Sequence, residues 1–195
     1  MIDAIRAALR ETGTETSDFD LNPDVQLPEG CKLRPAGVLA PIVEAEDGLR
    51  LLLTKRSSAL KHHPGQIAFP GGKQDEADAD VVAAALREAR EEIGLPTEIV
   101  DVLGTLPPHE TVTGFTVTPV FAFVRDTFEL KPEAGEVEEV FSVPLVHVQN
   151  PANYLIESRR WRGTRRHYFT VPYGPYYIWG ATARMLRAWA ERMTS

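Results

Sequence analysis

The 195-residue sequence predicts an α+β fold in which a mixed β-sheet carries a few helices. Strand-like segments occupy most of the middle of the chain, whereas helical periodicity is confined to three segments. The composition, 43% hydrophobic and 25% charged, is ordinary for a globular protein with a sizeable core. The length is that of one large domain, and no internal repeat interrupts the chain.

The chain begins with a helix and an arm. Ile2, Ile5 and Leu9 recur at helical spacing, which predicts a helix over residues 3–11. The polar stretch "ETGTETSDFDLNPD" follows and is typical of a loop or extended arm. We expect residues 1–34 to pack as a helix and arm on a main domain formed by residues 35–195.

A hairpin and a glycine-rich loop come next. Residues 37–45 and 49–56 have strand patterns and are joined by the turn "EDG". Residues 57–80 are rich in Gly, Pro and Asp and are predicted to be mostly loop, with "QIAF" as a short strand. A helix is predicted over residues 79–92, with Asp78 as its N-cap.

The second half of the chain continues the sheet. Segments 97–106 and 116–124 are strand-like and are separated by the loop "PPHETVTGF". Residues 136–145 combine a loop with an extended segment, and 161–171 resemble a hairpin that turns at Gly163 and Thr164.

An amphipathic helix closes the chain over residues 176–193. Its predicted apolar face consists of Ile178, Thr182, Met185, Leu186 and Trp189. The aromatic residues that lead into it are expected to belong to the core: Tyr173, Tyr176, Tyr177 and Trp179.

Charge and cysteine content exclude several classes of function. The net charge of −7 argues against a general nucleic-acid or membrane-surface binder. The single cysteine, Cys31, excludes an internal disulfide. Neither a signal peptide nor an apolar run long enough to span a bilayer is present, so we expect a cytoplasmic enzyme or binding domain with a small-molecule partner. The sequence does not indicate an oligomeric state.

The stretch "REAREE" concentrates carboxylates on the helix predicted at 79–92. Glu91 and Glu92 follow Glu88 by three and four residues, so the three side chains project together. One interpretation is a solvated face on which Arg87 pairs with Glu91. The other is a hard-oxygen site for Mg²⁺ or Mn²⁺, because "FPGGK" leads into the helix and glycines let a backbone carbonyl approach a cation.

These residues resemble the Nudix hydrolase family, whose box is G-x5-E-x7-R-E-U-x-E-E-x-G-U with U bulky and apolar. "REAREEIGL" matches the second half, with the small Ala89 at the first U. In the first half, one extra loop residue puts Gly72 and Asp78 in the positions of the box glycine and the upstream glutamate. The resemblance implies a Nudix-type α/β/α sandwich with a catalytic loop and helix.

A second motif resembles the coenzyme A diphosphatase branch of the family: L-L-T-x-R-S-x3-R-x3-G-x3-F-P-G-G. Residues 52–72 match it at ten positions. Lys61 stands where the branch usually has Arg, which keeps the charge but loses bidentate geometry. The branch is also similar in its longer loop before the helix.

The resemblance implies metal-dependent hydrolysis of coenzyme A to 3′,5′-ADP and 4′-phosphopantetheine. Glu88 and Glu92 would bind Mg²⁺ or Mn²⁺ with the Gly72 carbonyl. Glu91 would act as a further ligand or water activator, and Arg87 would hold a box glutamate in place.

Two further roles follow from the resemblance. Glu136 stands where many relatives carry a general base, with Glu138 and Glu139 as competitors. Arg56 and Lys61 would contact substrate phosphate. The alternatives are a Nudix hydrolase of another nucleotide, such as ADP-ribose, and a non-catalytic Nudix-fold binding module.

Overall fold

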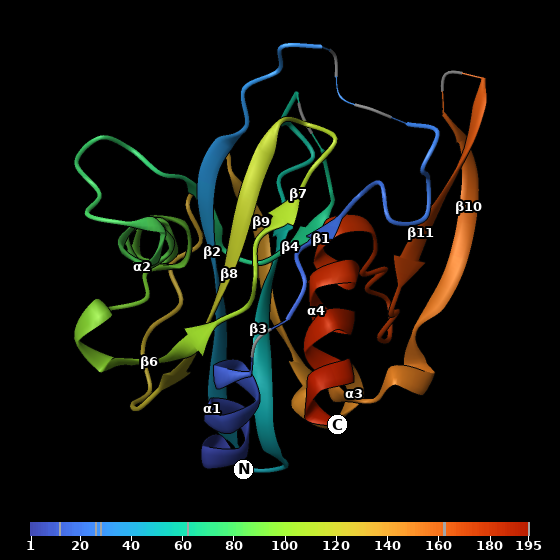
Figure 1. Ribbon diagram of the computed structural model, residues 1–195. Coiled ribbons are helices and arrows are strands. Elements are labelled where there is room, and N and C mark those ends of the chain that lie inside the picture. Colours follow the sequence, from blue (N-terminus) through green and yellow to red (C-terminus); the bar gives the residue numbers. More distant parts are fainter. Residues whose placement is uncertain (12, 26, 28, 62, 162, 195) are drawn as a thin grey trace.

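A computed structural model describes residues 1–11, 13–25, 27, 29–61, 63–161 and 163–194, and shows a layered α+β molecule (Figure 1). A nine-stranded mixed sheet separates helix α2 (Val81–Ile93) from helices α1 (Ile2–Arg10) and α4 (Gly180–Met193). The predicted α+β class is therefore confirmed. None of the helices in the described ranges is long and apolar enough to cross a membrane.

Strand β2 (Arg34–Ala45) is the centre of the sheet. It runs antiparallel to β3 (Gly48–Arg56) and parallel to β8 (Phe115–Val124). The predicted hairpin is thus confirmed, with Ala45 opposite Gly48. Ala40 and Ile42 join the core under α1 and α4, whereas Leu39 joins the core under α2, because alternate residues of a strand face opposite sides.

The remaining strands pair with β2 and its neighbours and widen the sheet. Strand β9 (Val137–Pro144) pairs with β3, and β6 (Val100–Thr105) pairs with β8. The other strands of the sheet are very short: β1 (Thr16–Ser17), β4 (Ile67–Ala68), β5 (Gly71–Lys73) and β7 (His109–Glu110). The sequence predicted β4 but not β1, β5 or β7, because two or three residues carry no periodicity and their partners lie far away in the chain.

Helix α2 carries the box residues and starts later than predicted. Its N-cap is Asp80, whose carboxylate accepts a hydrogen bond from the Ala83 amide, so the prediction of Asp78 as the cap was wrong. Asp78 instead accepts hydrogen bonds from the Arg87 side chain. Gly94 ends the helix in the left-handed conformation at φ 74°.

The N-terminal segment lies against the sheet and α4. Ile5 is fully buried in the core, and α1 contacts β6 and α4. Further along, β1 pairs in parallel with β7. The side chain of Asn22 then donates to the His167 carbonyl and accepts from the His167 amide, both at 2.8 Å.

The C-terminal part adds a separate hairpin. After α3 (Leu145–Gln149), strands β10 (Leu155–Trp161) and β11 (Thr164–Thr170) pair antiparallel outside the main sheet (Figure 1). A hairpin was predicted here, but Thr164 already pairs with Trp161 rather than lying in the turn, and most of β10 precedes the predicted segment. Helix α3 was not predicted. Two single-turn 3₁₀ helices, Thr97–Ile99 and Pro151–Asn153, complete the structure.

The aromatic segment before α4 differs from the prediction. Tyr173 and Tyr176 form an isolated β-bridge, so the helix begins at Gly180 rather than at residue 176. Tyr177 is 41% exposed, and the other three aromatic residues are only partly buried. Tyr173 and Tyr176 pack against the main core, as expected, and Ile178 nearby is fully buried, whereas the exposed Tyr177 does not belong to the core.

Candidate active site

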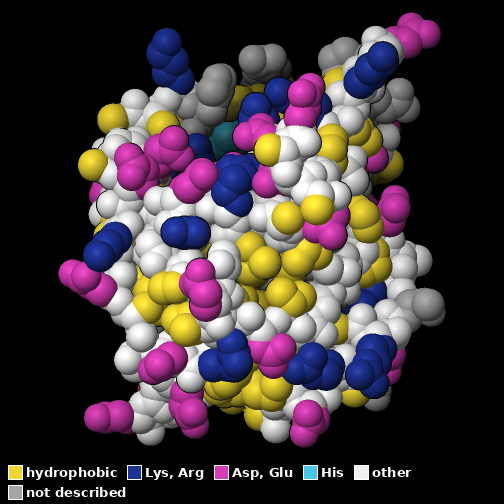
Figure 2. Space-filling model, turned by 90° about the vertical axis from the view of Figure 1, so that its left-hand side faces the viewer, with side chains coloured by type: hydrophobic (Ala, Val, Ile, Leu, Met, Phe, Trp, Pro, Cys, Tyr) yellow, Lys and Arg dark blue, Asp and Glu magenta, His cyan; other side chains and the backbone are white. Residues whose placement is uncertain are grey.

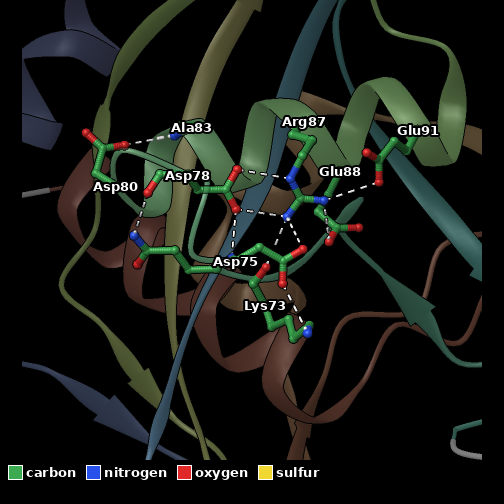
Figure 3. A network of polar contacts seen from close by, with 9 residues as sticks. Lys73, Asp75, Asp78, Asp80, Ala83, Arg87, Glu88 and Glu91 are labelled. Atoms are coloured by element: carbon green, nitrogen blue, oxygen red, sulfur yellow. Dashed lines mark hydrogen bonds and ion pairs between the residues drawn. The ribbon is translucent and has the colours of Figure 1, made fainter.

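Arg87 is the hub of a polar network at the start of α2 (Figure 3). Its Nε and Nη2 donate to the two oxygens of Asp78 at 3.0 and 2.9 Å, a bidentate pair. Its Nη1 donates to Glu88 Oε1 at 3.0 Å and to Glu91 Oε2 at 3.2 Å. The Lys73 carbonyl accepts a further bond at 3.2 Å. One guanidinium therefore ties the glycine-rich loop to two glutamates of the helix.

The charges of this network stabilise one another. The hydrogen bond from Arg87 holds the pKa of Asp78 below its ordinary value, and Asp78 in turn raises the pKa of Arg87. The Asp78 side chain is only 6% exposed. Asp75, 3.7 Å from Arg87, adds a further carboxylate that the sequence did not indicate, because no local pattern separates it from its acidic neighbours.

Glu92 is the most buried carboxylate of the site, with 6% of the residue exposed. Its Oε2 accepts a hydrogen bond from the Gly71 amide at 2.9 Å. Burial raises the pKa of Glu92 to about 7, since desolvation disfavours the charged form. The Gly71 amide and Arg56 oppose this shift, whereas Glu88 and Glu136 add to it.

Glu88 lies against the glycine loop. Its side chain is 17% exposed, and a methyl group built on Gly72 would lie 2.5 Å from Glu88 Oε1. Burial raises the pKa of Glu88, Arg87 lowers it, and Glu91 and Glu136 raise it further. A side chain at position 72 would therefore displace the Glu88 carboxylate from its place beside the backbone.

Glu91 lies at the outer side of the network, with a side chain 59% exposed and directed to Arg87. Within the described ranges, no three His, Cys, Asp or Glu side chains are grouped closely enough to surround one metal ion. The structure thus brings Glu88 and Glu91 to the same Arg87 nitrogen and turns Glu92 inward toward Gly71.

Three glutamates at the start of β9 were candidates for the general base, and the structure distinguishes them. Glu138 forms an ion pair with Lys55 at 2.6 Å, and Glu139 accepts a hydrogen bond from Tyr176 at 2.5 Å. Glu136 is exposed and acts electrostatically on both Glu88 and Glu92. Of the three, Glu136 is therefore the one whose charge reaches the buried carboxylates. The Tyr176 contact was not indicated by the sequence, because the two residues are 37 positions apart.

The two predicted phosphate-binding cations occupy different places. Arg56 ends β3 at an irregularity in its pairing with β9, and its positive charge lowers the pKa of Glu92. Lys61 is exposed in the loop between β3 and β4, and among the described residues no ion pair joins it to the carboxylates. His63 is an exposed residue of the same loop.

The donor set suits a divalent cation. Glu88 and Glu92 are one helical turn apart and both have a raised pKa, and repulsion from Glu88 contributes to the raised pKa of Glu92. A hard cation between them would offset that repulsion, and carboxylate and carbonyl oxygens are the ligands that Mg²⁺ and Mn²⁺ prefer. Figure 2 shows that acidic and basic side chains lie in the upper part and along the lower part of this face, around an apolar middle.

Comparison with known proteins decides the family. Residues 33–162, two thirds of the chain, match the NUDIX domain. The chain belongs to the Nudix family. Residues 87–95 and the glycines of β5, which resemble the Nudix box, lie within the matched region.

Sequence relatives and solved structures agree with this assignment. The chain is 43% identical over 154 residues to a protein of Enterobacter sp. (strain 638) named uncharacterized Nudix hydrolase NudL, covering 79% of this chain and 80% of that protein. It is 44% identical over 155 residues to the protein of the same name from Cronobacter sakazakii, with the same coverage.

Two crystal structures share the fold. One is a MutT protein from Methanosarcina mazei, with TM-score 0.52, 20% identity, and coverage of 86% of this chain and 96% of that one. The other is RenU, a Nudix hydrolase from M. smegmatis, with TM-score 0.51, 24% identity, and coverage of 62% and 83%. The predicted Nudix-type fold is thereby confirmed.

Proposed function

We propose that this protein is a metal-dependent coenzyme A diphosphatase that releases 3′,5′-ADP and 4′-phosphopantetheine. Family membership supports a hydrolase of a nucleoside diphosphate derivative. The observation that carries the finer proposal is the position of Arg56. This cation of the 52–72 motif lies close enough to the box helix to act on the buried carboxylate of Glu92.

The bond to be broken is the P–O–P bridge of the substrate. Water adds to one phosphorus, the bridging P–O bond breaks, and the proton of the water passes to a base. Glu88, Glu92 and the Gly72 carbonyl would hold Mg²⁺ or Mn²⁺, which neutralises phosphoryl charge and lowers the pKa of water.

The protein residues supply position and proton transfer. Arg87 holds Glu88 and Glu91 through one nitrogen, so it orients the carboxylates from behind. Glu91 is a further ligand or water activator. Glu136 is the proposed general base, because Glu138 and Glu139 are bonded to other side chains. Arg56 and Lys61 would contact substrate phosphate.

The test is hydrolysis of coenzyme A with Mg²⁺ or Mn²⁺, beside ADP-ribose and nucleoside triphosphates, with products separated by chromatography. The matched variants are Glu92→Gln, within the site, and Glu98→Gln, an exposed glutamate after the box helix. We expect release of 3′,5′-ADP, a loss of at least about 100-fold in Glu92→Gln, and little change in Glu98→Gln.

The alternatives give different results. Turnover of ADP-ribose or another nucleotide but not coenzyme A would keep the Nudix activity and refute the substrate. Absence of turnover with every substrate and metal would favour a non-catalytic Nudix-fold binding module.

A further inference from the structure

The hairpin β10–β11 places positive charges directly opposite each other. Arg159 faces Arg166 across one face, and Arg160 faces Arg165 across the other. Like charges in directly opposed positions destabilise an antiparallel pair unless an anion lies between them. We call the side with Arg159 and Arg166 the aromatic face, because it also carries the rings described next.

The aromatic face combines these cations with indole and phenol rings. The Arg159 guanidinium lies 4.4 Å from the centroid of the Trp179 ring and 5.2 Å from that of Trp161. Tyr168 meets Trp179 edge to face, with ring centroids 5.1 Å apart. Flat rings beside a guanidinium are the groups that bind a nucleobase and its phosphate.

The cations of this face have unused bonding capacity. Arg166 Nε is buried and has no hydrogen-bond partner. In the described part of the chain, neither Arg159 nor Arg166 forms an ion pair with a carboxylate. The carboxylate nearest in register, Glu157, already accepts a hydrogen bond from Tyr177 at 2.7 Å. Because Arg166 Nε is enclosed, an external acceptor would meet the outer nitrogens of the two guanidiniums, with which no carboxylate forms an ion pair in the described residues.

A short series of neighbouring residues connects the aromatic face with Arg56. Trp179 precedes α4, where Gly180 lies beside the Gln66 side chain and Thr182 donates to the Ile67 carbonyl at 3.1 Å. The Gln66 carbonyl accepts from the Arg56 amide at 2.9 Å. Trp179 is therefore two contacts away from the arginine that acts on Glu92.

We propose that the aromatic face binds the 3′-phosphorylated adenosine end of the substrate, with Arg159 and Arg166 on the 3′-phosphate and Trp179 against the base. This inference rests on the proposed function. The other end of coenzyme A, the pantetheine arm, offers neither an anion for opposed guanidiniums nor an aromatic ring for stacking.

Binding without turnover tests the proposal. Isothermal titration calorimetry would compare adenosine 3′,5′-bisphosphate with 5′-AMP, which lacks the 3′-phosphate. We expect the wild type to bind the bisphosphate at least about tenfold more tightly, the scale of one or two charge-assisted hydrogen bonds. The double variant Arg159→Gln/Arg166→Gln should lose this preference.

The other side of the same hairpin provides the control. Arg160→Gln/Arg165→Gln removes the same charge from the same two strands and should keep the preference. If both double variants lose the preference for the bisphosphate equally, the effect comes from overall charge and the proposal is overturned. The proposal is also overturned if the wild type binds the bisphosphate and 5′-AMP equally well. Failure of coenzyme A hydrolysis with a retained, Arg159- and Arg166-dependent preference would instead refute only the proposed reaction.

Discussion

Burial distinguishes the three glutamates of α2 from one another. Glu92 is 6% exposed, the Glu88 side chain 17% and the Glu91 side chain 59%. The energetic benefit of a cation grows as water is removed, so Glu92 and Glu88 gain most from a bound metal. Glu91 is in contact with solvent and gains less from a cation than the two buried glutamates.

Glu136 is the candidate general base that the structure favours over Glu138 and Glu139. If Glu136 is the proposed general base, Glu136→Gln should lower kcat about 100-fold or more, because the group that would accept the proton of water is lost. Steady-state kinetics on coenzyme A would measure it. Glu138→Gln, two residues away and paired with Lys55, is the control and should keep most of the activity. Equal losses in the two variants would assign the base elsewhere.

Asp78 gives a pH-dependent prediction. Its pKa is lowered in the folded protein by the bond from Arg87, so the unfolded chain binds a proton at a higher pH than the folded one. The stabilisation is complete above the ordinary pKa of 3.8 and is lost as the pH falls through the lower folded value. We expect Asp78→Asn to melt below the wild type at pH 7, and the difference to shrink below about pH 4.

Thermal melts of Asp78→Asn at pH 7 and in acid would check this. Asp80→Asn is the control, since asparagine also caps a helix and Asp80 is not bonded to Arg87. A difference between Asp78→Asn and the wild type that persists unchanged in acid would contradict the assigned role of the ion pair.

At the scale of elements, α2 is held against β2 by a close backbone contact. A methyl group on Gly37 would collide with the Val81 carbonyl oxygen at the first turn of the helix. We therefore expect Gly37→Ala to destabilise the protein by about 1–3 kcal/mol through overpacking, measured by urea unfolding.

Gly72→Ala is the variant to compare with Gly37→Ala, because Gly37 of β2 and Gly72 of β5 lie opposite each other in the sheet. Its methyl group would meet a movable side chain, Glu88, rather than backbone. Activity should fall while stability changes less than in Gly37→Ala. The reverse ranking of the two variants would show that the contact at Gly37 relaxes at little cost.

Sequence patterns predicted the elements that carry their own periodicity, namely the β2–β3 hairpin, the body of α2, and the β10–β11 hairpin. Strands β1, β5 and β7 could not be predicted, because each exists only through a partner brought near by the fold. The N-cap of α2 was predicted at the wrong residue for a similar reason. Asp78 and Asp80 are equivalent as local signals, and only the position of Arg87 separates them.

In the candidate site, too, local patterns predicted some features, and others depended on residues far apart in the chain. The box motif indicated the residue types, and the folded chain showed that Glu138 and Glu139 are engaged with Lys55 and Tyr176. These pairings join residues 83 and 37 positions apart, beyond the reach of any local pattern. The preference for Glu136 over its neighbours therefore depends on the structure.

For the whole molecule, we propose that residues 1–34 form a packed arm of the main domain, residues 35–195, and unfold with it. Ile5 is fully buried among residues of the larger core. Ile5→Ala should cost about 2–5 kcal/mol and lower Tm by roughly 4–20 °C. Calorimetry should still show one transition.

Ile156→Ala is the control for this prediction, because Ile156 is 56% exposed on the outer hairpin. Its Tm should stay close to that of the wild type. A Tm for Ile5→Ala as high as that of the control, or two separate transitions, would show that the arm is energetically independent of the domain.

The bonds between Asn22 and His167 have a consequence for self-association. A two-stranded ribbon exposes two rows of backbone groups, each able to recruit a strand from another molecule. At His167 the side-chain amide of Asn22 occupies both the donor and the acceptor that such a strand would use. The arm thus blocks one edge of the ribbon against intermolecular strand addition, a safeguard against aggregation made from a single side chain.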